Sequence, residues 1–198
     1  MKNGKTIAAI LGLGLSAAMP LAAHAQAATP GAYVGIGLGQ STTQDVQCDP
    51  LPICDKKGAA WKFYGGWQFH RNFAAEVGYT DLGRFRDGTP GVFTEEIKTR
   101  LSEATLVGSY PVTERFSVFG KVGAYYAASK FTSTGSSGTR YVNRTNGGPT
   151  YGGALQYFVW TNLAVRGEFQ RYRKLWGGGT LVESDVDLWT VGLLAKFK

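Results

Sequence analysis

The sequence predicts an all-β fold, namely an eight-stranded antiparallel up-and-down transmembrane β-barrel. Segments of about ten residues recur in which apolar side chains alternate with small or polar ones, the pattern of a strand with two different faces. Charged residues make up only 18% of the 198 residues, which is low for a water-facing surface. Beyond residue 27 no apolar run approaches the roughly 18 to 20 residues that a spanning helix needs, so a membrane crossing requires a closed barrel.

The first four strand-like segments put large apolar side chains on one face. They are Ala32–Gln40, Trp61–Phe69, Phe73–Leu82 and Thr99–Tyr110. In the first three, the residues expected to face lipid are Ala32, Val34, Ile36, Leu38, Trp61, Phe63, Trp67, Phe69, Phe73, Ala75, Val77 and Tyr79. The alternation weakens in the fourth segment, where we assign Ala104, Leu106 and Tyr110 to lipid and Glu103, Thr105 and Val107 to the interior.

The last four segments repeat the pattern. They are Phe116–Ala128, Thr150–Trp160, Asn162–Tyr172 and Trp189–Phe197. Lipid contact is expected for Phe116, Val118, Val122, Ala124, Tyr126, Tyr151, Leu155, Tyr157, Val159, Leu163, Val165, Phe169, Trp189, Val191, Leu193, Ala195 and Phe197. Aromatic residues near the strand ends, such as Trp61, Tyr110 and Trp160, suit the two interfacial girdles of a membrane protein.

The connections between these segments alternate in length. His70–Asn72, Pro111–Arg115 and Thr161–Asn162 are short, whereas Ser41–Ala60, Gly83–Ile97, Lys130–Pro149 and Arg173–Asp185 are long, polar and expected to form loops. Outer-membrane barrels have short periplasmic turns and longer external loops. An even number of strands then places both termini in the periplasm.

A soluble, lipocalin-like barrel is the main alternative, because it also has eight strands. Such a barrel would turn its polar face to water and its apolar face inward. Here the face opposite the large apolar residues carries Lys62, Glu76, Lys121, Arg166 and Glu168, while the apolar face carries no charge. The distribution therefore favours a barrel in a membrane.

The first residues have the features of a secretory signal peptide. Lys2 and Lys5 precede an apolar stretch, Ile7–Leu21, and Ala23-His24-Ala25 is a small-x-small cleavage site. An uncleaved membrane anchor is less consistent with so short a stretch. We expect a signal peptide over residues 1–25, with cleavage after Ala27 as an alternative, and a barrel domain over residues 26–198.

Cys48 and Cys54 are the two cysteines, and they lie close together within an expected external loop. Oxidation is expected in an exported protein, so we predict a disulfide between them. A zinc site is a poorer alternative, because two thiols without a nearby histidine leave the ion short of ligands.

Four stretches in order resemble the transmembrane domain of the OmpA family and related opacity-type surface proteins. They are AEVGYTDLGR at residues 75–84, YPVTERFSVFGKVG at 110–123, AVRGEFQ at 164–170 and WTVGLLAKF at 189–197. The resemblance implies an outer-membrane location. It also implies an acid–base cluster inside the barrel, to which Glu76, Lys121, Arg166 and Glu168 correspond by position. Because the chain ends at Lys198, we expect no peptidoglycan-binding domain of the kind that full-length members carry.

The interior charges suggest a plug rather than a channel. The expected cluster consists of Lys62, Glu76, Glu103, Lys121, Arg166 and Glu168. An eight-stranded barrel is only wide enough for side chains to fill, and buried charges must be paired. A narrow pore for small solutes is the alternative.

Enzymatic chemistry is not expected. Some eight-stranded outer-membrane barrels modify lipid A with an external histidine, but His70 lies in an expected periplasmic turn, away from any serine that it would activate. No cofactor or metal site is expected.

We therefore predict a monomeric structural protein that displays its external loops, with an adhesion-type role. Expected partners are outer-membrane lipid and lipopolysaccharide, and possible ones are host or phage surfaces, since the basic residues Lys130, Arg140, Arg144, Arg171, Arg173 and Lys174 lie in or near the loops. A nucleic-acid partner is not expected in this compartment.

Overall fold

The computed structural model describes residues 30–44, 53–89, 92–136, 138–176 and 184–197. These residues form nine strands in one sheet. The strands are β1 (Gly31–Thr43), β2 (Ile53–Asp55), β3 (Lys57–His70), β4 (Phe73–Thr89), β5 (Phe93–Pro111), β6 (Phe116–Gly135), β7 (Gly138–Phe158), β8 (Leu163–Tyr172) and β9 (Val186–Lys196). None of the described residues forms a helix that is long and apolar enough to cross a membrane.

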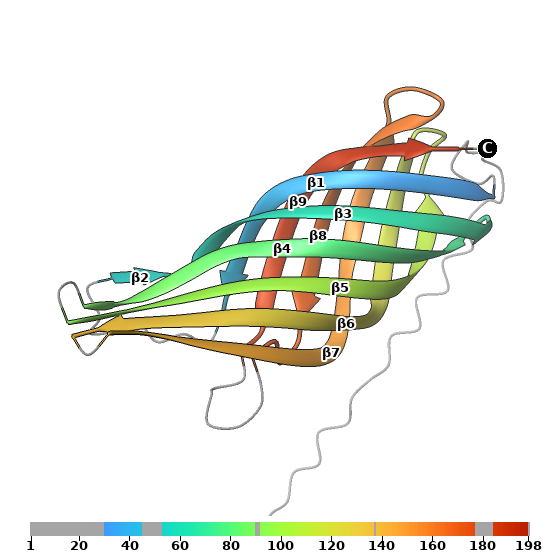
Figure 1. The fold of residues 1–198 in the computed structure, drawn as a ribbon. Coiled ribbons are helices and arrows are strands. Elements are labelled where there is room, and N and C mark those ends of the chain that lie inside the picture. Colours follow the sequence, from blue (N-terminus) through green and yellow to red (C-terminus); the bar gives the residue numbers. More distant parts are fainter. Residues whose placement is uncertain (1–29, 45–52, 90–91, 137, 177–183, 198) are drawn as a thin grey trace, which may run out of the picture.

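Eight of the strands close into a ring (Figure 1). Neighbours pair in the order β4-β3-β1-β9-β8-β7-β6-β5, and β4 pairs with β5 to complete the circle. All pairings are antiparallel, and β1 joins the last strand, β9, from Tyr33–Lys196 to Thr43–Val186. The short β2 lies outside the ring, on the edge of β4. The prediction of an eight-stranded antiparallel barrel is confirmed.

The inside and outside of each strand follow the alternation expected from the sequence. Val34, Ile36 and Leu38 are exposed on the outer wall of β1, while Tyr33 is buried inside. In β5, where the pattern was weakest, Glu103, Thr105 and Val107 are buried and Leu106 and Tyr110 are exposed. Alternation with a period of two therefore predicted which side chains face the lumen even in the least regular strand.

Two of the four expected long loops are strands instead. The ranges Gly83–Ile97 and Lys130–Pro149 are mostly occupied by the β4–β5 and β6–β7 hairpins, whose tips lie beyond Thr89 and Gly135. Their alternation continues, because Phe85, Ile97, Phe131 and Val142 stand opposite one another across the four strands. This apolar row lies on one face, and Arg84, Arg86 and Lys98 lie on the other, so the polar composition of these ranges did not mean irregular structure.

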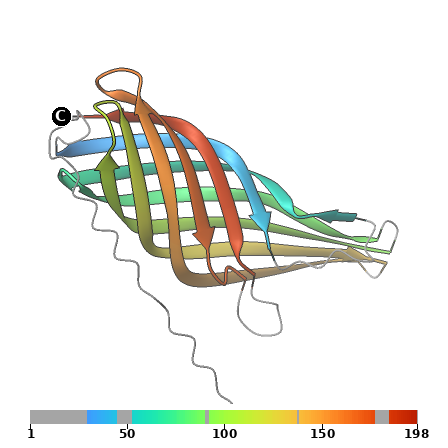
Figure 2. The same ribbon diagram turned by 180° about the vertical axis from the view of Figure 1, so that it is seen from behind.

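The hairpins carry a sheet past the rim of the barrel. Among the described residues, β4 last pairs with β3 at Asp81–Trp61, and β7 last pairs with β8 at Thr150–Tyr172. Beyond those points β4, β5, β6 and β7 continue as a four-stranded extension, visible on the left of Figure 1 and the right of Figure 2. We call it the hairpin sheet (residues 84–89, 93–98, 130–135 and 138–143) and the rim that carries it the hairpin end.

A β-bulge marks the point where β4 leaves the barrel. The pairing with β5 shifts between Asp81, opposite Arg100, and Arg84, opposite Lys98. Gly83 within the bulge has φ 81°, a left-handed conformation that favours glycine, and its amide donates to Asp81 Oδ1 at 2.9 Å. The extra residue reverses which residues of β4 face inward. Even-numbered residues such as Glu76 and Thr80 face the lumen before the bulge, and the odd-numbered Phe85 faces inward after it.

Apolar clusters close both ends of the lumen. At the hairpin end, Leu175 and Trp176 follow β8 and pack into a cluster with Phe85, Leu101 and Tyr125, among others. The Trp176 indole donates to Thr99 Oγ1 at 3.1 Å. At the opposite end, which carries the short turns and which we call the turn end, the cluster consists of Tyr33, Tyr64, Ala74, Val107, Phe158, Ala164 and Leu194.

Candidate functional site: the charge cluster in the lumen

Six charged side chains lie inside the barrel between the two apolar clusters. Lys62 comes from β3, Glu76 from β4, Glu103 from β5 and Lys121 from β6, while β8 supplies Arg166 and Glu168. Each is at an inward position of its strand, and each is buried, with at most 6% of its surface exposed. These are the six residues that the sequence analysis assigned to the interior.

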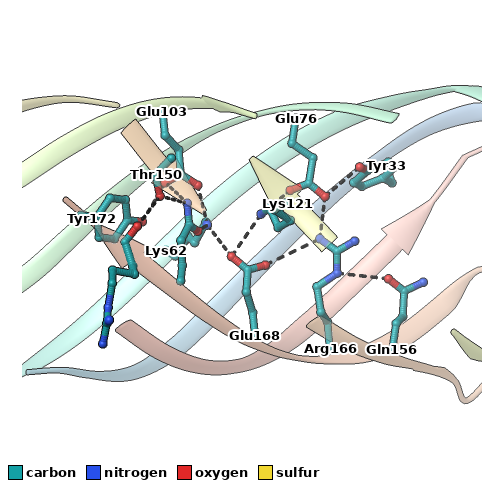
Figure 3. A network of polar contacts seen from close by, with 12 residues as sticks. Tyr33, Lys62, Glu76, Glu103, Lys121, Thr150, Gln156, Arg166, Glu168 and Tyr172 are labelled. Atoms are coloured by element: carbon teal, nitrogen blue, oxygen red, sulfur yellow. Dashed lines mark hydrogen bonds and ion pairs between the residues drawn. The ribbon is translucent and has the colours of Figure 1, made fainter. Parts of the chain in front are cut away.

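The six side chains form one continuous chain of alternating charge (Figure 3). In order they are Glu103, Lys62, Glu168, Lys121, Glu76 and Arg166, with successive N···O distances of 2.5, 2.6, 3.1, 2.6 and 2.6 Å. Three cations face three carboxylates, so the set is neutral. Since an isolated buried charge is strongly unfavourable, the arrangement places each of the six groups beside at least one opposite charge.

Neutral polar side chains complete the network at both ends. The Tyr172 hydroxyl donates to Glu103 Oε2 at 2.7 Å, and the Gln170 amide nitrogen donates to the same oxygen at 2.9 Å. At the other end, the Tyr33 hydroxyl donates to Glu76 Oε1 at 2.8 Å, and Arg166 Nε donates to Gln156 Oε1 at 3.2 Å. The sequence analysis did not assign these four residues to the cluster, although they share the inward parity of its members.

Aromatic rings pack against the cations, and glycines make room for them. The Arg166 guanidinium lies 5.1 Å from the centre of the Tyr64 ring and 4.9 Å from that of Phe119. A Cβ on Gly35 would overlap the Tyr64 ring, and one on Gly66 would overlap the Tyr33 ring. The glycines of β1 and β3 therefore leave the space in which these tyrosines lie across the lumen.

A small cavity lies beside the cluster inside the described part of the barrel. This cavity of about 20 Å³ lies near the turn end, lined by residues that include Tyr33, Gln156 and Arg166. This volume is on the order of what one water molecule requires. The geometry thus provides charge pairing and packing.

The other candidate groups lie apart from the cluster. His70 is at the end of β3 in a tight turn, where its ring packs against Phe73 and its Nδ1 accepts from the Asn72 amide at 3.2 Å. Within the described residues no group of three or more potential ligands among His, Cys, Asp and Glu is placed to hold a metal ion. Cys48 lies outside the described residues, as does the expected signal peptide, so the disulfide with Cys54 and the cleavage site stay predictions.

The barrel is similar in sequence to a known protein family and to curated outer-membrane proteins. Residues 26–198 match the family model described as OmpA-like transmembrane domain. Outer membrane protein P5 of Haemophilus influenzae is 27% identical over 179 residues, a match that covers 84% of this chain and 50% of P5. The chain therefore spans about half the length of the curated relatives it matches.

Several solved structures share the fold. Ail of Yersinia pestis matches with a TM-score of 0.57 at 19% identity, over 85% of this chain and 100% of Ail. Neisserial surface protein A gives 0.56 at 13% identity, over 84% and 97% of the two chains. The N-terminal barrel of Pseudomonas aeruginosa OprF gives 0.54 at 10% identity, over 85% and 100%. At these identities the likeness concerns the fold alone.

Proposed function

Because this chain belongs to the OmpA-like transmembrane domain family and is a β-barrel of the outer membrane, we propose that it is a structural and surface-display protein. The observation that carries the proposal is the hairpin sheet, in which two hairpins continue past the rim as one paired surface. Such a sheet holds its outer residues in fixed positions, as an adhesion-type contact requires. We further propose that the barrel acts as a monomer and that residues 1–25 are a cleaved signal peptide, which the start of the family match at residue 26 supports.

The interior is proposed to be a plug and not a pathway. The alternating chain from Glu103 to Arg166 crosses the lumen, and apolar clusters lie on both sides of it. An eight-stranded barrel filled in this way has no room for a column of water. The pairing of each charged group in the cluster with an opposite charge supports a structural, non-enzymatic role.

Planar-bilayer recording tests the plug. The unmodified protein should show no resolved openings under conditions in which a pore-forming porin conducts. Frequent, well-resolved openings by the unmodified protein would instead support the alternative, a narrow pore for small solutes.

Hairpin shortening tests the display role. Removing residues 133–140 and joining the strands with a two-residue turn takes away the tip of the β6–β7 hairpin while keeping the barrel pairings from Ser129 inward. Bacteria that express this variant should lose the attachment to host cells or immobilised sulfated glycan that the full chain confers. Ail was solved with the heparin analogue sucrose octasulfate, which makes a sulfated glycan a reasonable first probe. A full chain that confers no attachment to any surface tested would contradict the adhesion-type role.

A further inference from the structure

Three cations stand in direct register across the outward face of the hairpin sheet. Arg84 on β4 is opposite Lys98 on β5, and Lys98 is opposite Lys130 on β6. Directly opposed residues of an antiparallel pair have Cβ atoms roughly 4.5 to 5.5 Å apart, and like charges in such positions destabilise the sheet. The row is therefore unfavourable unless negative charge gathers over it.

Carboxylates of the chain neutralise this face only in part. Glu96 lies 2.9 Å from Arg86 and 3.9 Å from Arg84, and Asp81 lies 3.1 Å from Arg100 and 3.9 Å from Lys98. A third carboxylate, Asp55 on β2, is opposite Arg86 in register. Among the described residues of β2, β4, β5 and β6, five cations thus face three carboxylates on this side of the sheet, which leaves a surplus of positive charge.

The surplus is concentrated on Lys98 and Lys130. The arginines Arg86 and Arg100 take the shorter carboxylate contacts, at 2.9 and 3.1 Å. Lys98 has only the 3.9 Å contact with Asp81, and the contact found for Lys130 in the described part of the chain is with the Tyr141 ring, 4.8 Å away. Two neighbouring ammonium groups are therefore available to one anionic group between them.

The height of this face above the membrane identifies the kind of anion. Tyr79, two residues before Asp81, packs against Trp61 at 5.7 Å within the aromatic belt at the hairpin end. At about 3.3 Å per residue, the Arg100 row is about 7 Å along the strands from the Tyr79 row, and the Lys98 row is one further step of about 7 Å away. Strands of outer-membrane barrels tilt by about 35 to 45°, so the Arg100 row is about 5 Å and the Lys98 row about 10 Å higher than the Tyr79 row. The polar layer of one leaflet is about 5 to 7 Å thick, so Arg100 lies within it and Lys98 lies just above it, within reach of a lysine side chain.

We propose that the outward face of β4, β5 and β6 just above the aromatic belt binds phosphate groups of the outer-leaflet glycolipid, lipopolysaccharide. Lys98 and Lys130 together hold one phosphate, and Arg100 reaches the headgroup level below them. The proposal rests on the outward orientation of the hairpins in the proposed function, and it adds a lipid site on the side of the hairpin sheet, separate from the tips that display would use.

The test measures the urea midpoint of unfolding of the full chain in phosphatidylcholine vesicles that contain increasing fractions of diphosphorylated lipid A. The variant is Lys98→Gln with Lys130→Gln. The matched control is Arg140→Gln with Arg144→Gln, which removes the same charge from the opposite face of the hairpins. Since each basic residue near an anionic surface strengthens binding about fivefold, the variant should need roughly thirtyfold more lipid A for half of the stabilisation. The control should follow the unmodified chain.

Two further measurements distinguish loss of the lipid A site from a general change in stability and from binding of other anions. In pure phosphatidylcholine the lysine variant should be at least as stable as the unmodified chain, because an opposed pair of like charges is gone. Any stabilisation by soluble sucrose octasulfate added to the same vesicles should be the same in the lysine variant as in the unmodified chain. The proposal would be overturned if the variant and the control lost the stabilisation by lipid A equally, or if neither lost it. It would also be overturned if the lysines were needed for an effect of the soluble polyanion but not for an effect of lipid A. Because Lys98→Gln with Lys130→Gln keeps both hairpins, its failure leaves the attachment test of the display role unaffected.

Discussion

Arg166 and Glu76 meet across the lumen, with Nη1 of the arginine 2.6 Å from Oε1 of the glutamate. Ninety residues separate them in sequence, and their strands, β8 and β4, are not neighbours in the ring. The pair therefore joins opposite walls of the barrel, and each partner neutralises a buried charge.

Replacing Arg166 with alanine should destabilise the barrel strongly. Glu76 would keep Lys121 but lose the arginine, and Glu168 would lose its more distant cation at 3.9 Å. Removing one partner of a buried ion pair costs about 3 to 5 kcal/mol, which urea unfolding in lipid vesicles would measure. Arg84→Ala is the control, because its 3.9 Å contact with Glu96 is exposed and should be worth about 0 to 1 kcal/mol. Equal effects of the two substitutions would contradict the buried-pair interpretation, and a conducting Arg166→Ala beside a silent parent would support the plug.

Replacing Val77 with arginine tests the assignment of the outer wall. Val77 is 65% exposed on β4 and faces away from the lumen, so in the membrane it contacts lipid. An arginine near the bilayer midplane should lower the free energy of unfolding by about 2 to 4 kcal/mol. Thr139→Arg, at an exposed position of the hairpin sheet, should change it by less than about 0.5 kcal/mol. An unaltered urea profile for Val77→Arg would show that this face does not meet lipid.

Gly35→Ala tests whether the inward glycines of β1 are needed for packing. The added methyl group would overlap the Tyr64 ring, which in turn packs on Arg166. Overpacking of this kind costs about 1 to 3 kcal/mol, measurable as a lower urea midpoint. Gly120→Ala makes the same change on the outer wall, where nothing lies within 4 Å of the new methyl group, and should be nearly neutral. A neutral Gly35→Ala would mean that Tyr64 can move aside freely.

The Cys48–Cys54 disulfide remains a prediction from the sequence. Protein purified from the outer membrane should have a mass two protons lower than the reduced chain, and it should not react with thiol reagents until reduced. Because the bridge would close only a short loop, reduction should leave the urea midpoint of the barrel nearly unchanged. Two reactive thiols in freshly purified protein would exclude the bridge.

The interior was predictable because a membrane barrel imposes a simple rule on alternate residues. Lys62 and Glu168 were assigned inward by parity, and parity alone requires no knowledge of their partners. What parity cannot supply is distance across the lumen, which depends on how the ring closes and on strand register. The pairing of Lys62 with both Glu103 and Glu168, and the hydroxyl that Tyr172 directs to Glu103, thus became known only from the structure.

The hairpin sheet was missed for a different reason. Charged residues such as Arg86 and Glu96 were interpreted as signs of loops, yet they occupy one face of regular strands and pair with each other at 2.9 Å. Beyond the rim both faces of a strand can meet water, so few positions need to be apolar. The alternation of apolar and polar residues is then marked only by single residues such as Phe85 and Ile97. The Gly135-Ser136-Ser137-Gly138 stretch between two alternating runs was the available sign of a tight hairpin.

The arrangement of the interior charges also bears on how the barrel enters the membrane. Among the described residues, every ion pair of the cluster joins strands that are not neighbours, except the 3.9 Å contact of Arg166 with Glu168 within β8. A single hairpin such as β3–β4 would therefore present Lys62 and Glu76 unpaired to hydrocarbon, where bare charges are costly. We expect the barrel to insert through intermediates in which these charges stay hydrated and away from lipid. Water should leave the lumen only when β1 pairs with β9. Pairing of the first and last strands is then the step that completes insertion into the bilayer.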